Sequence, residues 1–316
     1  MISDELLKQV RLLQLRSRRA VNEVFAGEYS SAFKGRGMEF AEVRQYQPGD
    51  EIRTIDWNVT ARTGEPYIKR FVEERELTLM FVVDMSGSSE FGSERRLKRE
   101  TAAEICALLG YAALANNDKV GLVIFSDRVE NYVPPKKGQN HTLRVVRELL
   151  EFNTEPEGKK KQRKRGRCEM RRGTNGVAAL EHLGKVLKRK AIVVFVSDFL
   201  FGEAAGDEEV EKSFETALRL IARRHDLVTV HVADPREMEM TNAGMIELED
   251  PETGARAWVD AGSKRVRNAF GALARRHEAQ VRERSRRAGA DHLFVRTDRP
   301  YVHDLVQLFH RREKRR

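Results

Sequence analysis

Cysteine is scarce in this chain, with two residues among 316. Cys106 lies in an apolar, helix-like stretch and Cys168 in a basic one, so they form no C-x-x-C pair. This spacing does not favour a disulfide framework or a thiolate metal site. Because unpaired thiols are typical of a reducing compartment, we expect a cytoplasmic protein.

Long apolar runs are also missing. The longest, such as AIVVFV at 191–196, has the length of a strand, whereas a membrane-spanning helix needs about 20 apolar residues. The first residues, MISDELLKQVRLLQLRSRRA, carry charges throughout, which does not fit a signal peptide. The sequence therefore predicts neither a membrane span nor secretion.

The short motifs of common enzyme sites are absent too. The chain has no G-x-x-x-x-G-K-[ST], no G-x-G-x-x-G after a predicted strand and no G-x-S-x-G. H-E-x-x-H is absent, and the eight histidines show no metal-ligand spacing. We expect the pair His277 and Glu278, on a long basic stretch of helical pattern, to be solvated. These absences argue against a nucleotide site, a serine nucleophile and a zinc site.

Basic residues exceed acidic ones, 58 against 49, which leaves a formal charge of +9. The segment EPEGKKKQRKRGRCEMRRG at 155–173 is dense in Lys and Arg and almost free of apolar residues. It is typical of a solvated surface loop, and the alternative is a docking segment for an anionic partner. Aromatic residues do not interleave with it and no base-reading module is present, so nucleic-acid binding is not favoured.

The chain divides into two parts by its pattern. Apolar residues at 4–25 recur at roughly helical spacing and predict a helix. Gly and Pro punctuate the next stretch, which predicts short β segments at 42–46 and 67–71 and no helix. We therefore expect a helix and a β elaboration over residues 1–76, followed by a larger domain at 77–316.

From residue 77 onward, predicted strands alternate with helices. LTLMFVV at 77–83, KVGLVIFS at 119–126 and AIVVFVS at 191–197 are continuously apolar, which is typical of strands covered on both faces. RVENYV is a candidate edge strand, and 245–260 predicts a hairpin insertion. The alternation predicts an α/β fold with a doubly wound, mostly parallel sheet.

A carboxylate and two hydroxyls follow the first strand of that domain. In FVVDMSGSSEFG, the strand ends in Asp84, and Ser86 and Ser88 come at alternating positions. Ligands of doubly wound sheets lie beyond the carboxyl ends of the strands, and alternation places both hydroxyls on the side of the carboxylate. Three hard oxygen donors predict a site for Mg²⁺ or Mn²⁺.

Two more oxygen donors occur at equivalent places. Thr174 stands in a G-T-N-G turn ahead of a predicted helix, where it can cap the helix or face the cation. Asp198 ends a later strand, as Asp84 ends the first. In this order, D-x-S-x-S, the Thr and the last Asp resemble the metal-ion-dependent adhesion site of von Willebrand factor A domains. The resemblance implies a site for Mg²⁺, Mn²⁺ or Ca²⁺ made by Asp84, Ser86, Ser88, Thr174 and Asp198.

The sequence departs from that pattern at the last aspartate. The family usually shows Thr-Asp-Gly there, whereas this chain has Ser197, Asp198 and Phe199. Because glycine is missing at the third place, we expect a loop of different shape.

The segment before the sheet resembles a narrower family. Residues 35–76, with Y-x-P-G-D, I-D-W and A-R-T-G, resemble the bacterial domain-of-unknown-function 58 proteins, as do V-x-D-P-R-E at 232–237 and D-P-E-T-G at 250–254. Members are von Willebrand factor A-like proteins often encoded beside MoxR-type AAA ATPases. Residues expected to pack this segment against the sheet are Asp50, Asp56, Trp57 and Arg62.

These observations predict a non-enzymatic interaction protein that depends on a divalent cation. The resemblance implies an adaptor or co-chaperone whose partner, a MoxR-type ATPase or its client, offers an Asp or Glu to the metal. One alternative is a Mg²⁺-dependent phosphatase with Asp84 as nucleophile, although Ser86 stands where such enzymes carry a second acid. The other is nucleic-acid binding through residues 155–173.

Overall fold

A computed structural model describes residues 26–33, 38–73, 76–93, 96–152, 174–200, 208–250 and 254–314. The helix predicted at 4–25 and the basic segment at 155–173 lie outside the described residues. Contacts divide the chain into a hairpin unit, Phe33–Leu77, and a sheet unit made of the remainder. The predicted boundary between residues 76 and 77 stays a prediction, and α2 (Ala26–Phe33) belongs almost wholly to the sheet unit.

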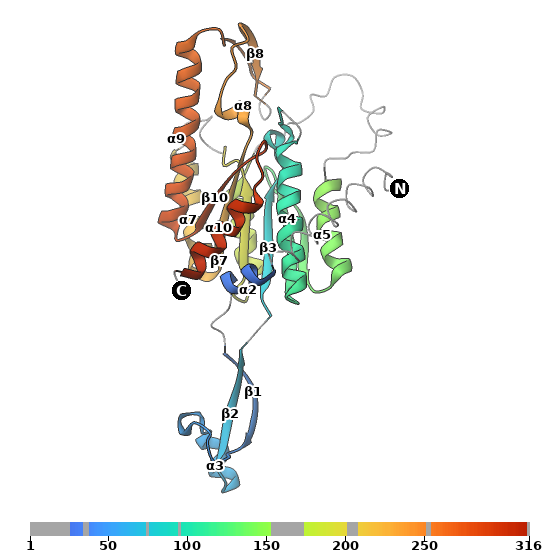
Figure 1. The fold of residues 1–316 in the computed structure, drawn as a ribbon, viewed down its shortest axis with the longest axis vertical. Helices are drawn as coiled ribbons and strands as arrows, with labels where there is room; N and C mark the ends of the chain where they lie inside the picture. Colours follow the sequence, from blue (N-terminus) through green and yellow to red (C-terminus); the bar gives the residue numbers. More distant parts are fainter. Residues whose placement is uncertain are drawn as a thin grey trace. The chain divides into compact units, whose positions relative to one another are not determined.

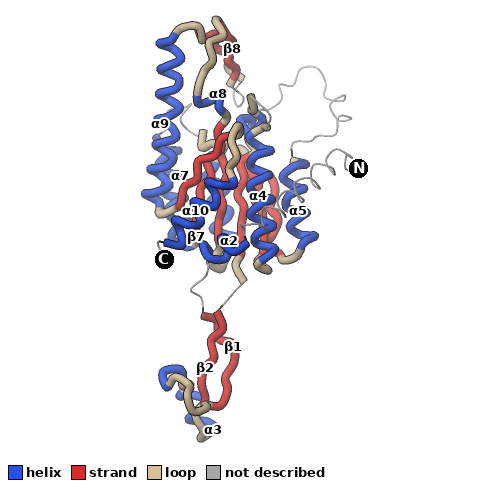
Figure 2. Tube along the Cα trace, in the orientation of Figure 1, coloured by secondary structure: helices blue, strands red, loops and turns tan. Residues whose placement is uncertain are grey.

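The hairpin unit is built on two antiparallel strands. β1 (Met38–Gln45) pairs with β2 (Tyr67–Glu73), with a bulge between Phe40 and Glu42. Both strands lengthen the β segments predicted at these places. A 3₁₀ turn, η2 (Ile52–Thr54), and a short helix, α3 (Trp57–Thr63), lie between them (Figure 2).

The prediction that this stretch has no helix is wrong, because its polar motifs cap one. The carboxylate of Asp56 accepts hydrogen bonds from the backbone N–H groups of Asn58 and Val59 at 3.0 and 3.3 Å. Gly64 ends α3 with a φ of 79°, a conformation that glycine adopts without steric cost. The I-D-W and A-R-T-G motifs are therefore the start and end of a helix.

The other residues singled out in this segment also have local structure. The Asp50 carboxylate accepts from the backbone N–H of Gln47 at 2.9 Å and pairs with Arg44 at 2.6 Å. Trp57 and Arg62 are exposed. Packing of these residues against the sheet stays a prediction.

The sheet unit contains the predicted doubly wound, mostly parallel sheet. The strand order is β10-β7-β6-β3-β4-β5, and all neighbours are parallel except β4 and β5. The edge strand β5 is the RVENYV segment, lengthened at its end. The strands are β3 (Thr78–Asp84), β4 (Lys119–Phe125), β5 (Val129–Lys136), β6 (Ile192–Ser197), β7 (Asp226–Ala233) and β10 (Asp291–Arg296).

Helices cover both faces of this sheet (Figure 1). The apolar side chains of Met80 and Val82 pack into a cluster with α6, α7 and α9, whereas α2, α4, α5 and α10 lie on the other face. Tyr29 of α2 packs edge to face on Phe309 of α10 at 6.3 Å. The helices are α4 (Lys98–Ala115), α5 (Gln139–Glu151), α6 (Gly176–Val186), α7 (Glu208–Arg224), α9 (Lys264–Ala288) and α10 (Val302–Lys314).

An insertion rises between β7 and α9. It begins with the short helix α8 (Pro235–Met238) and continues into the predicted hairpin, β8 (Met245–Glu249) paired with β9 (Arg256–Asp260). Figure 1 shows the hairpin and the first half of α9 extending beyond the carboxyl ends of the parallel strands. Across the described part of the chain, no helix combines the length and apolar character of a membrane span.

Candidate metal centre at the carboxyl edge of the sheet

Asp84 is the last residue of β3, between β4 and β6 in the middle of the sheet. The next backbone N–H, of Met85, donates to the carbonyl of Phe125 at 2.8 Å, so the chain leaves the sheet beside β4. It then turns: the N–H of Ser86 donates to Asp84 Oδ1 at 3.0 Å, and the hydroxyls of Ser86 and Ser88 are 3.1 Å apart. The D-x-S-x-S motif therefore gathers its three side chains at one point.

Asp198 joins this group from the end of β6. The preceding residue, Ser197, donates its hydroxyl to Asp84 Oδ2 at 2.6 Å, which ties the two strand ends together. Asp84, Ser88, Ser197 and Asp198 all line one cavity of about 20 Å³. A cavity must offer roughly 10–15 Å³ to hold a water molecule, so there is room for one body of that size.

Lys98 is the residue at this site that sequence reasoning missed. It is the first residue of α4, and its side chain is 4% exposed. The ammonium lies 2.7 Å from Asp198 Oδ2 and 2.6 Å from Oε1 of Glu237 in α8. A lysine at a helix start is usually solvated, so the sequence gave little signal. Glu237 stood in the V-x-D-P-R-E motif, but without an assigned role.

The two aspartates are charged to different degrees. Burial, reinforced by the negative charge of Asp198, raises the pKa of Asp84 to about 7. Burial also acts to raise the pKa of Asp198, but the ammonium of Lys98 outweighs it and the pKa falls to about 2. The protein thus supplies a cation for Asp198 and none of comparable effect for Asp84.

This donor set fits a hard divalent cation. A buried carboxylate without a compensating charge is costly, and a bound cation relieves that cost. Carboxylate and hydroxyl oxygens are the ligands that Mg²⁺ accepts, usually together with water. Among the described residues, no three or more His, Cys, Asp or Glu side chains are grouped to hold a metal, and this candidate is of another kind because hydroxyls supply part of its donors.

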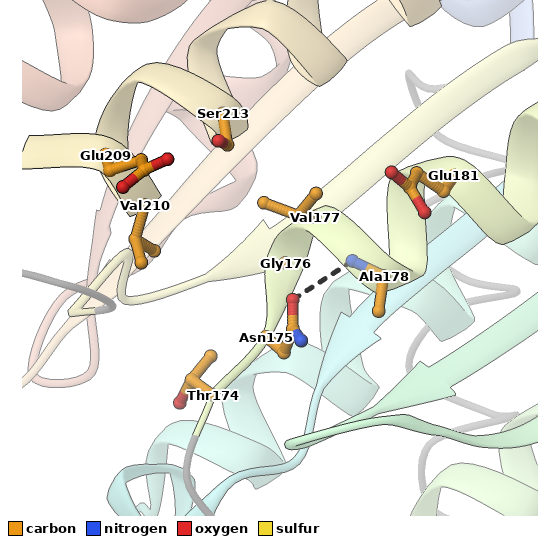
Figure 3. A pocket seen from close by; sticks show the side chains of 9 residues that line it. All are labelled: Thr174, Asn175, Gly176, Val177, Ala178, Glu181, Glu209, Val210 and Ser213. Carbon is orange, nitrogen blue, oxygen red and sulfur yellow. Dashed lines mark hydrogen bonds between the residues drawn. The ribbon is translucent and has the colours of Figure 1, made fainter. Parts of the chain in front are cut away.

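Thr174 lies near the same edge but lines a different pocket (Figure 3). The next N–H, of Asn175, donates to the carbonyl of Ser126 just beyond β4 at 2.7 Å. Asn175, not Thr174, caps α6, since its side-chain oxygen accepts from the N–H of Ala178 at 3.1 Å. Thr174 borders a pocket of about 440 Å³ between α6 and α7. Its contribution to a cation stays a prediction.

The loop after Asp198 has a backbone suited to the glycine that the sequence lacks. Phe199 adopts a φ of 58°, a left-handed conformation that is uncommon for a bulky residue. Its ring is 3% exposed and packs against Phe195 and Phe214, with centroids 5.6 and 6.2 Å away. Burial of the aromatic ring offsets the backbone strain.

A second carboxylate fixes the surroundings of the site. Asp234, which is fully buried, follows β7 and accepts hydrogen bonds from the backbone N–H and hydroxyl of Ser93, from the N–H of Arg236 and from the hydroxyl of Thr297. Its own N–H donates to Glu237 at 2.9 Å, which completes a capping box on α8. Asp234 thereby joins the loop after the D-x-S-x-S turn to β7 and β10.

Three histidines lie beneath the site. His231 of β7 is buried, with ring centroids 5.3 Å from His277 of α9 and 6.2 Å from His292 of β10. His277 Nε2 is 3.0 Å from the carbonyl oxygen of Asp198. The prediction that His277 is solvated is therefore wrong, because its ring turns inward from the basic helix.

We predict that acid weakens the sheet unit through His292. Burial and, secondarily, Arg282 lower its pKa to about 4 in the folded protein, against 6.5 ordinarily. The unfolded chain therefore binds the proton first, and stability falls as the pH drops from about 6.5 toward 4. We expect a loss of about 2 kcal/mol between pH 7 and 4.5 from this group. Urea unfolding across this range measures it; an equally steep dependence in His292→Gln would contradict the assignment.

Sequence comparison gives the family. The model of "Protein of unknown function DUF58" matches residues 42–280. "Uncharacterized protein Rv1480" of Mycobacterium tuberculosis is 31% identical over 303 residues, which is 96% of this chain and 88% of that protein. "Uncharacterized protein YeaD" of Bacillus subtilis is 28% identical over 109 residues, 34% of this chain and 25% of that protein.

Solved structures with the same kind of α/β fold include two that we note. BatB from Bacteroides thetaiotaomicron has 15% identity and a TM-score of 0.45, over 75% of this chain and 99% of that one. The SpRpn10 VWA domain has 11% identity and a TM-score of 0.39, over 73% and 94%. Since the family model spans most of the sequence, the chain belongs to the DUF58 family.

Proposed function

We propose that this protein is a non-enzymatic interaction module whose binding site is completed by a divalent cation, Mg²⁺ in the first place. The supporting observation is the buried group formed by Asp84, Ser86 and Ser88, next to Asp198, around a cavity of the size of one water molecule. A bound Mg²⁺ would offer an open coordination position to a carboxylate from outside. The residues of this chain hold and orient the oxygens that make such binding possible.

The same edge of the sheet carries apolar side chains suited to a protein partner. Met245 of β8 and Trp258 of β9 are 60% and 68% exposed. The hairpin that carries them rises beyond the strand ends from which Asp84 and Asp198 emerge (Figure 1). Exposed aromatic and Met side chains are enriched at protein interfaces. A partner that presents an Asp or Glu to the cation can therefore also contact this hairpin.

The partner class we propose is a MoxR-type AAA ATPase or its client, with the chain as adaptor or co-chaperone. The phosphatase alternative gains no support from Ser86, whose hydroxyl contacts Ser88 and which offers no acid for proton transfer. Nucleic-acid binding through 155–173 concerns residues outside the described part of the chain.

Metal-dependent capture tests the proposal. We expect the immobilised full chain to retain a purified MoxR-type ATPase in excess Mg²⁺, to release it in excess EDTA and to retain it again when Mg²⁺ is restored. The reason is that the partner's carboxylate has no positive charge to meet once the cation is removed. Retention is measured on gels, with Mn²⁺ binding to the chain followed in parallel by electron paramagnetic resonance.

The outcomes separate the two parts of the proposal. Equal retention in Mg²⁺ and EDTA contradicts a cation-dependent contact. Mn²⁺ binding without retention of the ATPase contradicts the partner class and leaves the cation site standing. Absence of Mn²⁺ binding by the full chain contradicts the cation site itself.

A further inference from the structure

Lys98 is a cation built into the candidate site. Its ammonium bridges Asp198 and Glu237 at 2.7 and 2.6 Å, and its side chain is 4% exposed. Its backbone N–H donates to the carbonyl of Phe91 at 3.0 Å, just after the turn that carries Ser88. The lysine is thus fixed at both ends within the site, unlike a surface lysine that samples many rotamers.

The formal charges at this point are unequal. The carboxylates of Asp84, Asp198 and Glu237 face the single ammonium of Lys98, which leaves a formal charge of −2. A divalent cation makes the group neutral, and a monovalent one does not. Burial makes such a balance important, because unpaired charges in a poorly solvated site are costly.

Lys98 also has a second place to go. Asp198 Oδ2 faces the ammonium, and Oδ1 accepts from the N–H of Leu200 at 3.1 Å, so the carboxylate is already engaged on both oxygens. A cation that draws Asp198 into its shell weakens the contact with Lys98. Glu237, on α8, remains as a partner for the ammonium.

We propose that Lys98 competes with the divalent cation for Asp198, and that Glu237 accepts the ammonium when the cation binds. This inference rests on the proposed cation site and adds its regulation. Lys98 lowers the affinity for the cation and makes occupancy depend on the position of α8. Because α8 leads into the β8–β9 hairpin, a partner that moves the hairpin acts on Glu237 and so on cation binding.

Mn²⁺ titration of variants tests this competition, with affinity read by electron paramagnetic resonance. Lys98→Met keeps the length of the side chain and removes its charge, and we expect Mn²⁺ to bind about tenfold more tightly. Glu237→Gln removes the alternative partner, and we expect binding about threefold weaker or more. Lys98→Arg keeps the charge and is expected to stay near the wild-type affinity.

Arg99→Met is the matched control. Arg99 borders the same cavity and carries the same charge, but it pairs with Glu90 at 3.5 Å rather than with Asp198. We expect a change of less than about twofold in this variant. Equal tightening in Lys98→Met and Arg99→Met would show a general field effect and overturn the competition.

The results also distinguish the inference from the proposed function. If wild type and Lys98→Met bind Mn²⁺ equally, the competition is wrong and the cation site stands. If only Lys98→Met binds, the competition is supported and the wild-type site is contradicted. If neither binds, both are overturned. Thermal unfolding checks that each variant folds, and if Lys98→Met does not, unchanged affinity in Glu237→Gln overturns the inference.

Discussion

Asp84→Asn is expected to lower Mn²⁺ affinity at least about 100-fold, equivalent to about 2.7 kcal/mol, and to abolish Mg²⁺-dependent partner capture. The substitution removes the carboxylate whose charge the protein itself compensates least. The amide keeps the shape of the side chain, its oxygen still accepts from the N–H of Ser86, and its NH₂ can donate to the hydroxyl of Ser197. We therefore expect the fold to remain and the binding to be lost.

The matched control is Asp127→Asn. Asp127 is an exposed carboxylate just beyond β4, the strand next to β3, and its Oδ1 accepts from the hydroxyl of Ser126 at 3.0 Å. Mn²⁺ titration and capture should match the wild type in this variant. Cation affinity retained in Asp84→Asn, or lost equally in both variants, would contradict the role given to Asp84.

Asp234→Ala is expected to reduce the free energy of unfolding by about 3 to 4 kcal/mol. The carboxylate is fully buried and accepts from Ser93, Arg236 and Thr297. Alanine leaves two hydroxyls and two backbone N–H groups without their acceptor in a place that water does not reach readily, and each unsatisfied group costs about 1–3 kcal/mol before relaxation. Urea unfolding followed by circular dichroism measures the loss.

Two further variants calibrate this result. Asp234→Asn keeps one acceptor oxygen and should recover part of the stability. Asp298→Ala removes an exposed carboxylate that pairs with Arg296 beyond β10, and it should cost less than about 1 kcal/mol. A cost for Asp234→Ala as small as that of Asp298→Ala would show that the buried hydrogen bonds do not hold the strand ends together.

The strand ends were predictable because their signal is local. Continuous apolar runs that stop at a carboxylate identified β3 and β6, and the rule that parallel strands end at one edge brought Asp84 and Asp198 together. The side-chain alternation in D-x-S-x-S placed Ser86 and Ser88 beside the carboxylate. Neither step needed knowledge of a distant contact.

Other features depend on contacts between segments far apart in sequence. The pairing of Lys98 with Asp198 and Glu237 spans 100 and 139 positions, and nothing near Lys98 distinguishes it from a solvated lysine. Phe199 has a glycine-like backbone because α7 and β6 bury its ring, which the loop sequence does not reveal. The helix α3 was locally encoded by Asp56 and Gly64 and was overlooked in a stretch rich in turn residues.

The antiparallel edge strand β5 has a consequence for how molecules of this kind associate. It contains Pro134 and Pro135, which have no backbone N–H to donate, and its pairing with β4 is irregular there. An additional strand from another chain would find an interrupted row of donors on that side. Sheet extension across β5 is thereby discouraged, and self-association that would compete with partners is suppressed on that flank.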